Sequence, residues 1–424
     1  MALLCAADDN IKVVHAPEGC FHGLQVAIME RLEAAYEKSD PHSCFVFGGL
    51  PRRYLRKRST RVAPHILTTP TPEPPRLEAL QVDGSFGEGG GQILRTAVLF
   101  SIVAHRPIRV FRIRAGREVP GLRAQHVAVL EILRDISGGN LEGATVGSGE
   151  ISFSPGDGYR GSLQVDLKTA ASVTLVLQAV VPAVSLSASS LNLALTGGTD
   201  VPWSPSFDYF AKVLREGFRM AGIEFEVQAS RRGYYPRGGG KATCVIRPCP
   251  EVNALRLSSR PGDHPVAITS RCGRLPAHVS ARQALSATEA LRSEGIQVGE
   301  VTSSVEDADS PGSSVLLCEV ADGCLMGTDA LGAKGRPAEE VGEDAARRFA
   351  AQMRTGACID VNLADMLAPV VALSETESLL RVPAVTEHLT TSLHVARLFT
   401  SCDYSFTKDG AATLLSIRPG HDRR

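Results

Sequence analysis

The sequence has ten cysteines, but no two of them form a CxxC pair. The closest candidates, Cys244 with Cys249 and Cys318 with Cys324, are spaced more widely and have no matching pair of histidines. Structural zinc sites need four cysteine or histidine ligands, usually at short spacing. We therefore expect no zinc site, and we expect the cysteines to be thiols in a reducing compartment.

The chain also lacks an excess of charge of either sign. Its 424 residues carry a formal net charge of -1. The field of the whole protein therefore does not favour nucleic acid, and any anionic ligand must be held by a local group of arginines.

A long uninterrupted apolar run is missing as well. The longest apolar stretch, 170–186, contains Ser172, Thr174, Gln178 and Pro182, which favours a buried helix over a membrane span. The first residues, MALLCAADDN, fit neither a secretory signal nor a transit peptide. We expect a cytoplasmic or nuclear protein that does not enter a membrane.

Residues 1–76 differ in composition from the rest of the chain. They contain an amphipathic pattern at 22–38, a basic run RRYLRKR at 52–58 and the segment TTPTPEPP at 68–75. The last segment is typical of an extended linker. The basic run has the composition to contact RNA phosphates, but a solvated surface is the simpler interpretation. We interpret 1–76 as an N-terminal extension whose role stays open: an extra domain, a regulatory arm or a poorly ordered tail.

From about residue 77 the pattern changes to short strands that alternate with helices. Alternating apolar residues predict strands, and apolar residues three and four apart predict helices. The order strand–helix–strand–helix–strand–strand occurs twice before residue 250, and a third, partial set closes the chain. The predicted helices include 121–137, 170–186, 207–220, 360–373 and 388–399.

A different set of elements lies between the second and third units. Residues 258–356 predict the order strand–helix–strand–strand–strand–helix, with breaks rich in glycine, proline and serine at 258–265 and 307–314. We therefore predict a small α/β domain inserted into a larger, repeated α/β domain of the α+β type.

The densest candidate for a binding site is DGSFGEGGGQILR at 83–95, where a strand leads through a glycine-rich turn into a helix. Glycines allow backbone amides to approach an anion, and a helix start adds positive partial charge. The turn is not a P-loop, because it lacks the GxxxxGK[ST] pattern. Glu88 would repel a phosphate unless a divalent metal lay between them. The alternative is a tight turn with Glu88 exposed.

Four arginines stand close together in RIRAGREVPGLRAQH at 112–126, around a Gly/Pro turn. Guanidinium groups suit phosphate oxygens, but a solvated loop is equally consistent with the pattern. Two further glycine-containing segments are TGGTDVPWSPSFDY at 196–209, where Pro205 offers a flat apolar face to a base, and RRGYYPRGGGKA at 231–242. The second of these is also typical of a hairpin connection.

His388 stands where a helix is predicted to begin, in TEHLTTSLHVARLF at 386–399. A single histidine at a helix start is usually a capping or packing residue. His394 comes one and a half turns later, near the opposite side of the predicted helix, and no comparable loop is expected beside it.

Together, in order and in spacing, these segments resemble the RNA 3'-terminal phosphate cyclase family from about Asp83 to Arg418. The most specific matches are RGYYPRGGG at 232–240, GEGGGQILR at 87–95, and IRAGR with PGLR and QH between 113 and 126. The resemblance implies a large domain of three βαβαββ units, 77–257 and 357–424, with the small domain 258–356 inserted.

The resemblance also implies a reaction and its participants. ATP adenylylates a histidine, AMP passes to an RNA 3'-phosphate, and the 2'-hydroxyl attacks to give a 2',3'-cyclic phosphate. The partner is an RNA with a 3'-phosphate end, and a divalent metal, magnesium or manganese, assists. The RNA sequence and the oligomeric state stay open.

Carried over residue by residue, the family pattern makes His388 the nucleophile, with Thr391 completing the H-x-x-T motif. Arg114 and Arg117 stabilise the leaving pyrophosphate, and Glu88 binds the metal. The pattern places the remaining matches at the nucleotide: Gln92, Arg95, Gln125, His126, Gln178, Pro205, Asn362, Asp365 and Met366.

The sequence departs from the family pattern at four of the compared positions. Met366 replaces a usual glutamine, Asn362 stands where bacterial relatives tend to place an aromatic residue against the adenine, Ala171 replaces a glycine, and Ser392 replaces a common asparagine. The loss of a stacking ring weakens nucleotide binding by ~1 kcal/mol or somewhat more. These departures bear on nucleotide affinity more than on the chemistry.

Two other functions remain compatible with parts of the pattern. One is a non-catalytic cyclase-like protein that acts in ribosome assembly, and such relatives typically lack the nucleophilic histidine. The other is an enolpyruvyl-transferase-like enzyme, which is also built from repeated βαβαββ units. Covalent labelling by ATP separates the cyclase from both, because fold similarity alone does not decide function.

Overall fold

The structure, a computed structural model, describes residues 2–7, 10–15 and 78–420. The predicted amphipathic, basic and proline-rich segments of the extension lie outside the described residues. The chain divides into two compact units, Met1–Pro72 and Glu73–Arg424. In the first, strands β1 (Ala2–Ala7) and β2 (Asn10–His15) pair antiparallel.

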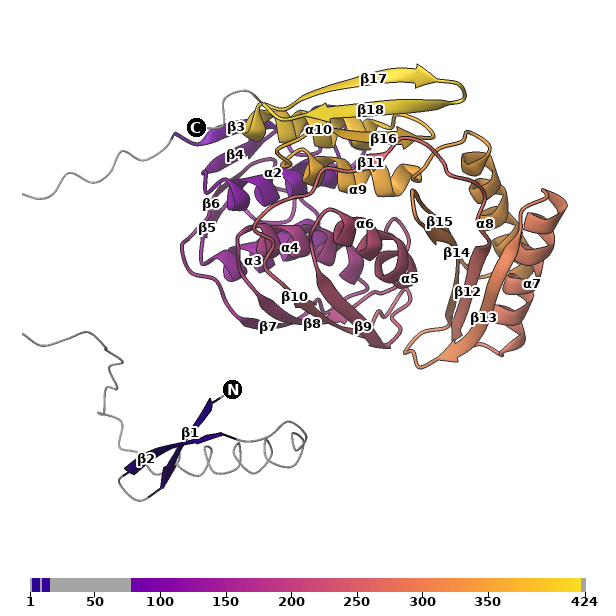
Figure 1. The fold of residues 1–424 in the computed structure, drawn as a ribbon, viewed down its shortest axis with the longest axis horizontal. Coiled ribbons are helices and arrows are strands. Elements are labelled where there is room, and N and C mark those ends of the chain that lie inside the picture. Colours follow the sequence, from indigo (N-terminus) through magenta and orange to yellow (C-terminus); the bar gives the residue numbers. More distant parts are fainter. Residues whose placement is uncertain (1, 8–9, 16–77, 421–424) are drawn as a thin grey trace, which may run out of the picture. The chain divides into compact units, whose positions relative to one another are not determined.

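The second unit begins with two complete βαβαββ sets (Figure 1). The first set consists of β3 (Leu80–Asp83), α2 (Gly91–Val103), β4 (Ile108–Phe111), α3 (Ala124–Ser137), β5 (Asn140–Glu142) and β6 (Ile151–Ser154). The second set consists of β7 (Ser162–Asp166), α4 (Val173–Leu186), β8 (Leu191–Gly197), a helix, β9 (Phe225–Arg231) and β10 (Gly240–Ile246). That helix runs as α5 (Phe207–Tyr209), the π-helical η1 (Phe210–Leu214) and α6 (Arg215–Met220).

A third set is interrupted by the insertion. Its first strand, β11 (Arg256–Leu257), precedes the inserted elements, and its other members follow them: α9 (Val361–Val371), β16 (Ser378–Val382), α10 (Glu387–Thr400), β17 (Asp403–Asp409) and β18 (Ala412–Arg418). β11 pairs in parallel with β16. The third unit is therefore complete, not partial as its sequence suggested, and the two-residue β11 was too short for a periodic signal.

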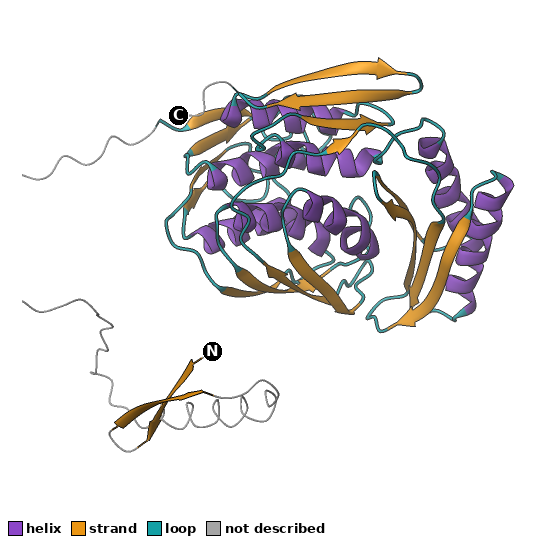
Figure 2. Ribbon diagram, in the orientation of Figure 1, coloured by secondary structure: helices purple, strands orange, loops and turns teal. Residues whose placement is uncertain are grey.

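All three units have the same strand order, first–second–fourth–third, in sheets β3-β4-β6-β5, β7-β8-β10-β9 and β11-β16-β18-β17. Burial alternates strictly along β10, as expected for a sheet with one face on the core and one in solvent. Figure 2 shows the sheets on the outside and the helices between them. The predicted fold class and its three repeats are thus confirmed.

The inserted elements form a separate layer pair at the right of Figure 1. They are β12 (Val266–Gly273), α7 (His278–Ser293), β13 (Val298–Glu306), β14 (Gly312–Ala321), β15 (Cys324–Leu331) and α8 (Ala338–Met353), with strand order β13-β12-β14-β15. This part has its own hydrophobic cluster, which includes Val266, Leu317 and Phe349. The element order matches the prediction for 258–356, and the boundaries of the individual domains stay a prediction.

The apolar stretch 170–186 forms the buried helix α4. Ser172 caps it, because its hydroxyl accepts a hydrogen bond from the amide of Leu175 at 3.2 Å. Most of the helix is buried, and it packs against helices α2 and α3 and against strands β8 and β10. In the part of the chain that the structure describes, every helix falls short of the length and apolarity that a membrane crossing needs.

Candidate active site

Four helices from the three repeats, α2, α4, α9 and α10, meet in the interior of the large unit. α2 packs against both α4 and α10, and α9 packs against α10. Because the glycine-rich turn opens α2 and His388 lies in the first turn of α10, two segments about 300 residues apart come into contact there.

His388 is fixed by the cap of its own helix. Thr386 is the N-cap of α10, and its hydroxyl accepts a hydrogen bond from the amide of Leu389 at 2.9 Å. The imidazole Nε2 of His388 lies 2.9 Å from Oε2 of Glu88. Its Nδ1 is buried and has no hydrogen-bond partner among the described residues. Since 43% of the side chain is exposed, Nε2 is the nitrogen that a ligand can reach.

The glycine-rich turn presents Glu88 to two cationic groups. Besides His388, the guanidinium of Arg117 contacts Glu88, with 2.7 Å between NH2 and Oε1. A methyl group on Gly90 would lie 1.8 Å from the same Oε1, so only glycine leaves room for the carboxylate here. The sequence predicted a turn that carries Glu88, but it did not predict the direct contact between Glu88 and His388.

The electrostatics of this cluster follow from its contacts. Burial favours the neutral Glu88, but the hydrogen bond from His388 and the charges of His388 and Arg117 outweigh it and hold the pKa of Glu88 below its ordinary value. The hydrogen bond to Glu88 raises the pKa of His388 and outweighs burial; the charges of Glu88 and Asp365 act in the same direction. Without a ligand, the pair is therefore an ionised carboxylate beside a histidine that holds its proton more firmly than usual.

The loop between β4 and α3, residues 112–123, is called the arginine loop here. Its two predicted catalytic residues, Arg114 and Arg117, make different contacts. Arg117 reaches Glu88, whereas Arg114 NH1 donates to the carbonyls of Val119 at 3.2 Å and Gly121 at 3.4 Å. Arg114 itself adopts a φ of 53°, an uncommon backbone conformation for a non-glycine residue. Arg114 thus holds the loop together, and Arg117 extends from it toward the turn.

Arg95 and His126 lie together behind the turn. A methyl group on Gly91 would be 2.3 Å from Nε2 of His126 and 3.2 Å from NH1 of Arg95. Burial, together with the charge of Arg95 and two further arginines, lowers the pKa of His126 to about 4. Burial also lowers the pKa of Arg95, to about 10. Gln125 is half-buried beside His126 in the first turn of α3.

Asp365 joins α9 to α10. Its Oδ1 accepts a hydrogen bond from Thr386 Oγ1 at 2.5 Å, and burial raises its pKa to about 7. Gln92 Nε2 donates to the backbone oxygen of Asp365 at 3.3 Å and to Ser392 Oγ at 2.5 Å. Ser392, the position where the family often has an asparagine, thereby accepts a hydrogen bond from the helix that follows the glycine-rich turn.

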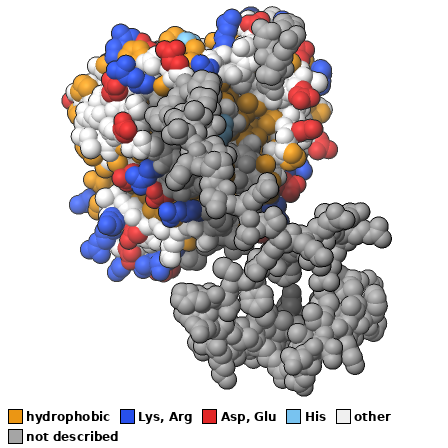
Figure 3. All heavy atoms as spheres, turned by 90° about the vertical axis from the view of Figure 1, so that its left-hand side faces the viewer, with side chains coloured by type: hydrophobic (Ala, Val, Ile, Leu, Met, Phe, Trp, Pro, Cys, Tyr) orange, Lys and Arg blue, Asp and Glu red, His pale blue; other side chains and the backbone are white. Residues whose placement is uncertain are grey.

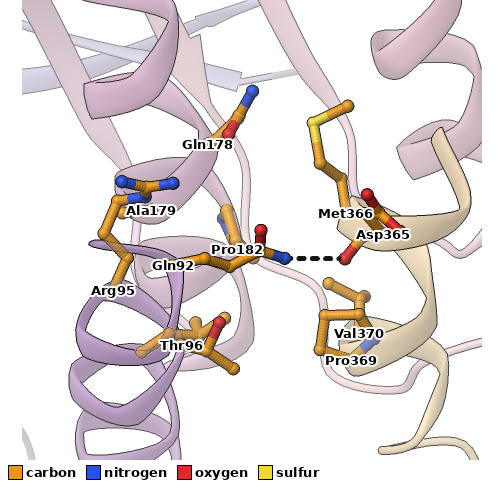
Figure 4. Close-up of a pocket in the computed structure, with 11 residues that line it drawn as sticks. Gln92, Arg95, Thr96, Gln178, Ala179, Pro182, Asp365, Met366, Pro369 and Val370 are labelled. Carbon is orange, nitrogen blue, oxygen red and sulfur yellow. Dashed lines mark hydrogen bonds between the residues drawn. The ribbon is translucent and has the colours of Figure 1, made fainter. Parts of the chain in front are cut away.

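A pocket opens next to this cluster, between α2 and α4 on one side and α9 on the other (Figure 4). Its lining residues are Gln92, Arg95, Thr96, Leu99, Gln178, Ala179, Pro182, Asp365, Met366, Pro369 and Val370. Five of them were predicted nucleotide contacts. The others lie on the same helical faces at spacings of three and four, so the sequence contains a periodic signal for them.

Four predicted nucleotide residues, Gln125, His126, Pro205 and Asn362, are not among the residues that line the pocket. Asn362 is exposed in the first turn of α9, one turn before Asp365. Pro205 precedes α5, and its carbonyl accepts a hydrogen bond from Thr174 near the start of α4 at 2.8 Å. Met366 replaces the family's glutamine inside the pocket, where it adds an apolar thioether opposite Gln178.

The RGYYPRGGG segment forms the β9–β10 connection, as the hairpin interpretation predicted, but its arginines have a second role. Arg232 is buried between Asp200 and Asp208, at 3.2 Å and 2.9 Å. Asp208 also pairs with Arg271 of the inserted sheet at 2.9 Å. The segment therefore ties the second repeat to the insertion and lies outside the pocket lining.

His394 corrects one expectation from the sequence. We expected no loop beside His394, but its ring stacks on Phe86 of the glycine-rich turn, with 3.7 Å between the ring centroids. Pattern reasoning missed this contact because it joins two segments far apart in sequence.

Figure 3 shows one face of the molecule with side chains coloured by type. On the coloured part of the face in Figure 3, basic and acidic side chains are interspersed. This mixture agrees with the net charge of -1.

Comparisons with known proteins find relatives that match most of the chain. A family model described as "RNA 3'-terminal phosphate cyclase" matches residues 86–406. A relative of that name from Pyrococcus furiosus is 41% identical over 318 residues, 75% of this chain and 92% of that protein. Relatives of the same name from Desulfurococcus amylolyticus and Thermococcus kodakarensis are each 40% identical, over 76% of this chain and 92% and 93% of theirs.

Among the solved structures that align with the chain is the enolpyruvyl transferase NikO from Streptomyces tendae. Its TM-score is 0.34 at 11% identity, and the alignment covers 80% of this chain and 48% of that one. A score this low supports no conclusion about function.

Proposed function

We propose that this chain, which belongs to the RNA 3'-terminal phosphate cyclase family, uses ATP to convert an RNA 3'-terminal phosphate into a 2',3'-cyclic phosphodiester through a covalent His388–AMP intermediate. The observation that carries the proposal is the position of His388. Its reachable Nε2 lies at the glycine-rich turn, 2.9 Å from Glu88, and Glu88 in turn contacts Arg117.

In the first step Nε2 of His388 attacks the α-phosphorus of ATP. The N–P bond forms, and the bond from that phosphorus to the bridging oxygen of pyrophosphate breaks. The attack needs a lone pair on Nε2, which donates to Glu88 in the ligand-free arrangement. Before bond formation, therefore, Nε2 must give up that proton to solvent and direct its lone pair at the phosphorus.

Arg117 and Arg114 stabilise the charge that pyrophosphate carries away. Arg117 is exposed and stands at the mouth of the turn, so its guanidinium can exchange Glu88 for phosphate oxygens. Arg114 supports it from within the loop. The amides of the turn and the start of α2 add positive partial charge on the same side.

We place the nucleotide in the adjoining pocket. Gln92, Arg95 and Gln178 offer polar groups, and Met366 and Pro182 offer apolar surface. We assign Pro205 and Asn362 to the outer end of this site. Asn362 has no aromatic ring that could stack on the adenine. On the same helix, α9, the thioether of Met366 offers apolar surface that replaces part of the missing stacking contact.

Glu88 is the candidate ligand for a divalent metal. Within the described residues, no group of three or more acidic, histidine or cysteine side chains is placed to hold an ion. A single ionised carboxylate does fit magnesium or manganese, which commonly bind through one carboxylate together with substrate phosphates. When bound, such an ion would neutralise phosphate charge. The chain's own contribution is to keep Glu88 ionised beside His388 and Arg117.

Two further steps complete the reaction. An oxygen of the RNA 3'-phosphate attacks the phosphorus of His388–AMP, so the N–P bond breaks and a phosphoanhydride forms. The RNA 2'-hydroxyl then loses its proton and attacks the 3'-phosphorus, AMP leaves, and the cyclic phosphodiester forms. Guanidinium groups recognise phosphate, not base sequence, so these residues indicate an RNA 3'-phosphate end and leave the RNA sequence open.

Covalent labelling tests the proposal directly. The wild-type protein, incubated with α-labelled ATP and magnesium or manganese, should carry label on a denaturing gel. His388→Ala should abolish the label while circular dichroism shows a folded protein. His105→Ala is the matched control, because His105 is an exposed histidine paired with Asp157.

The possible outcomes separate the competing functions. An unlabelled but folded wild-type protein would favour a non-catalytic role in ribosome assembly. Label retained in His388→Ala would move the nucleophile elsewhere, with His126 as the first residue to test.

A further inference from the structure

The glycine-rich turn contacts α10 through consecutive residues. Phe86 stacks on His394, with 3.7 Å between the ring centroids and 14° between the planes. Two residues later, Glu88 lies 2.9 Å from His388. The turn therefore runs along α10 toward the N-terminus of that helix. The Phe86–His394 contact lies at one end of this shared stretch, and the Glu88–His388 contact lies at the other.

The residue between them fills the gap. A methyl group on Gly87 would lie 2.2 Å from the hydroxyl of Thr391, and Gly87 adopts a φ of +61°. On α10 the contacted residues are three positions apart, so Thr391 is a helical neighbour of both histidines. Three consecutive residues of the turn, Phe86 to Glu88, thus face three residues of α10 that stand three positions apart. This correspondence fixes a single register between the turn and the helix.

We propose that the stacking of Phe86 on His394 sets this register and thereby holds Glu88 against His388. The inference rests on the proposed function, in which His388 is the nucleophile. Phe86 and His394 are positioning residues, because neither contacts a reacting atom.

The backbone next to Glu88 explains why an anchor is needed. Glycines stand at position 87 and at positions 89–91, and glycine restrains the chain less than any other residue. Phe86 is the nearest preceding side chain that can anchor the turn, and Gln92 is the nearest following one. Gln92 is held by Ser392 at 2.5 Å, so both ends of the glycine segment are fixed to α10.

The exposure of Phe86 argues against a purely structural role. Its side chain is 40% exposed, so it is not part of the hydrophobic core, and its flat contact with His394 accounts for its orientation. His394→Leu keeps an apolar side chain without a planar ring, and His394→Phe keeps the ring. The two variants therefore separate general packing from stacking.

The test measures the rate of self-adenylylation at saturating ATP, the Kd for ATP, and hydrogen exchange of the 83–95 peptide in the ATP-free protein. His394→Ala, His394→Leu and Phe86→Ala should each slow adenylylation by about tenfold or more, because small misplacements of reacting groups are costly. They should also speed hydrogen exchange in the turn, leave the melting temperature unchanged, and leave the Kd for ATP within about twofold of the wild-type value. His394→Phe should restore both the rate and the protection.

Phe406→Ala is the matched control. Phe406 pairs edge-on with Tyr404 on β17, outside the described site, and its loss should change neither readout. Wild-type rate and protection in His394→Ala, or equal behaviour of the Leu and Phe variants, would overturn the proposal. A wild-type protein that takes no label would contradict the proposed function, but hydrogen exchange would still decide whether the stack anchors the turn.

Discussion

The hydroxyl of Thr386 donates a 2.5 Å hydrogen bond to Oδ1 of Asp365 while it accepts one from the amide of Leu389. One side chain therefore caps the helix that carries His388 and holds a carboxyl group that is almost fully buried. Burial raises the pKa of Asp365 to about 7. The stability of the protein therefore depends on whether the Asp365 carboxyl group is protonated.

Asp365→Asn should change how stability depends on pH. A folded-state pKa above the unfolded value means that Asp365 contributes stability below about pH 4, and that this contribution is lost as pH rises toward 7. Asparagine stays neutral and keeps an oxygen for Thr386. Relative to wild type, the variant should therefore gain free energy of unfolding between pH 4 and 7, measured by urea titration at several pH values. A constant difference across that range would contradict the assignment.

Glu88→Gln should lower the pKa of His388 in the ATP-free protein. The variant removes the carboxylate whose hydrogen bond and charge raise that pKa. An NMR titration of the imidazole, assigned by comparison with His388→Gln, measures the shift. Glu150→Gln, at an exposed carboxylate paired with Arg109, is the control and should leave His388 unchanged. An unaltered pKa in Glu88→Gln would mean that the 2.9 Å contact does not persist in solution.

Arg117→Ala and Arg114→Ala should fail in different ways. Loss of Arg117 removes a group that can reach phosphate, so labelling at limiting ATP should fall while the arginine loop keeps its conformation. Loss of Arg114 removes the bonds to the carbonyls of Val119 and Gly121, so loop order should fall as well. Hydrogen exchange of the 112–123 peptide distinguishes the two, and similar exchange in both variants would show that Arg114 does not hold the loop.

Two glycine variants separate chemistry from folding. In Gly90→Ala the new methyl meets the flexible end of Glu88, so the carboxylate should move, adenylylation should be lost and the fold should persist. In Gly121→Ala the methyl meets the backbone of Gly147 at 2.2 Å, at a φ of +77°. That substitution should cost about 1 kcal/mol or more of stability, visible in thermal unfolding. A stable Gly121→Ala or an active Gly90→Ala would contradict this account.

The sequence predicted the fold because each repeat carries strong periodic signals. Helices α4 and α10 fall close to their expected bounds, since apolar spacing and caps such as Ser172 and Thr386 are local features. β11 was missed because two residues carry no period. Its role is visible only in its parallel pairing with β16 across the whole insertion.

The site was predictable in its residues but not in its contacts. Motif resemblance singled out His388, Glu88 and Arg117, yet it gave neither the path from His388 through Glu88 to Arg117 nor the Phe86–His394 stack. The contacts of His388 with Glu88 and of His394 with Phe86 join the first and third repeats, and tertiary packing alone decides them. The same holds for Arg232, whose buried pairs with Asp200 and Asp208 explain a glycine-rich motif that the sequence could only describe as a hairpin.

The most direct test isolates the labelled protein, removes free ATP, and adds an RNA oligonucleotide with a 3'-phosphate. Mass spectrometry should first place AMP on His388; the label should then leave the protein as AMP while the RNA acquires a 2',3'-cyclic end. An adduct on another residue, or an adduct at His388 that RNA does not discharge, would contradict the central claim.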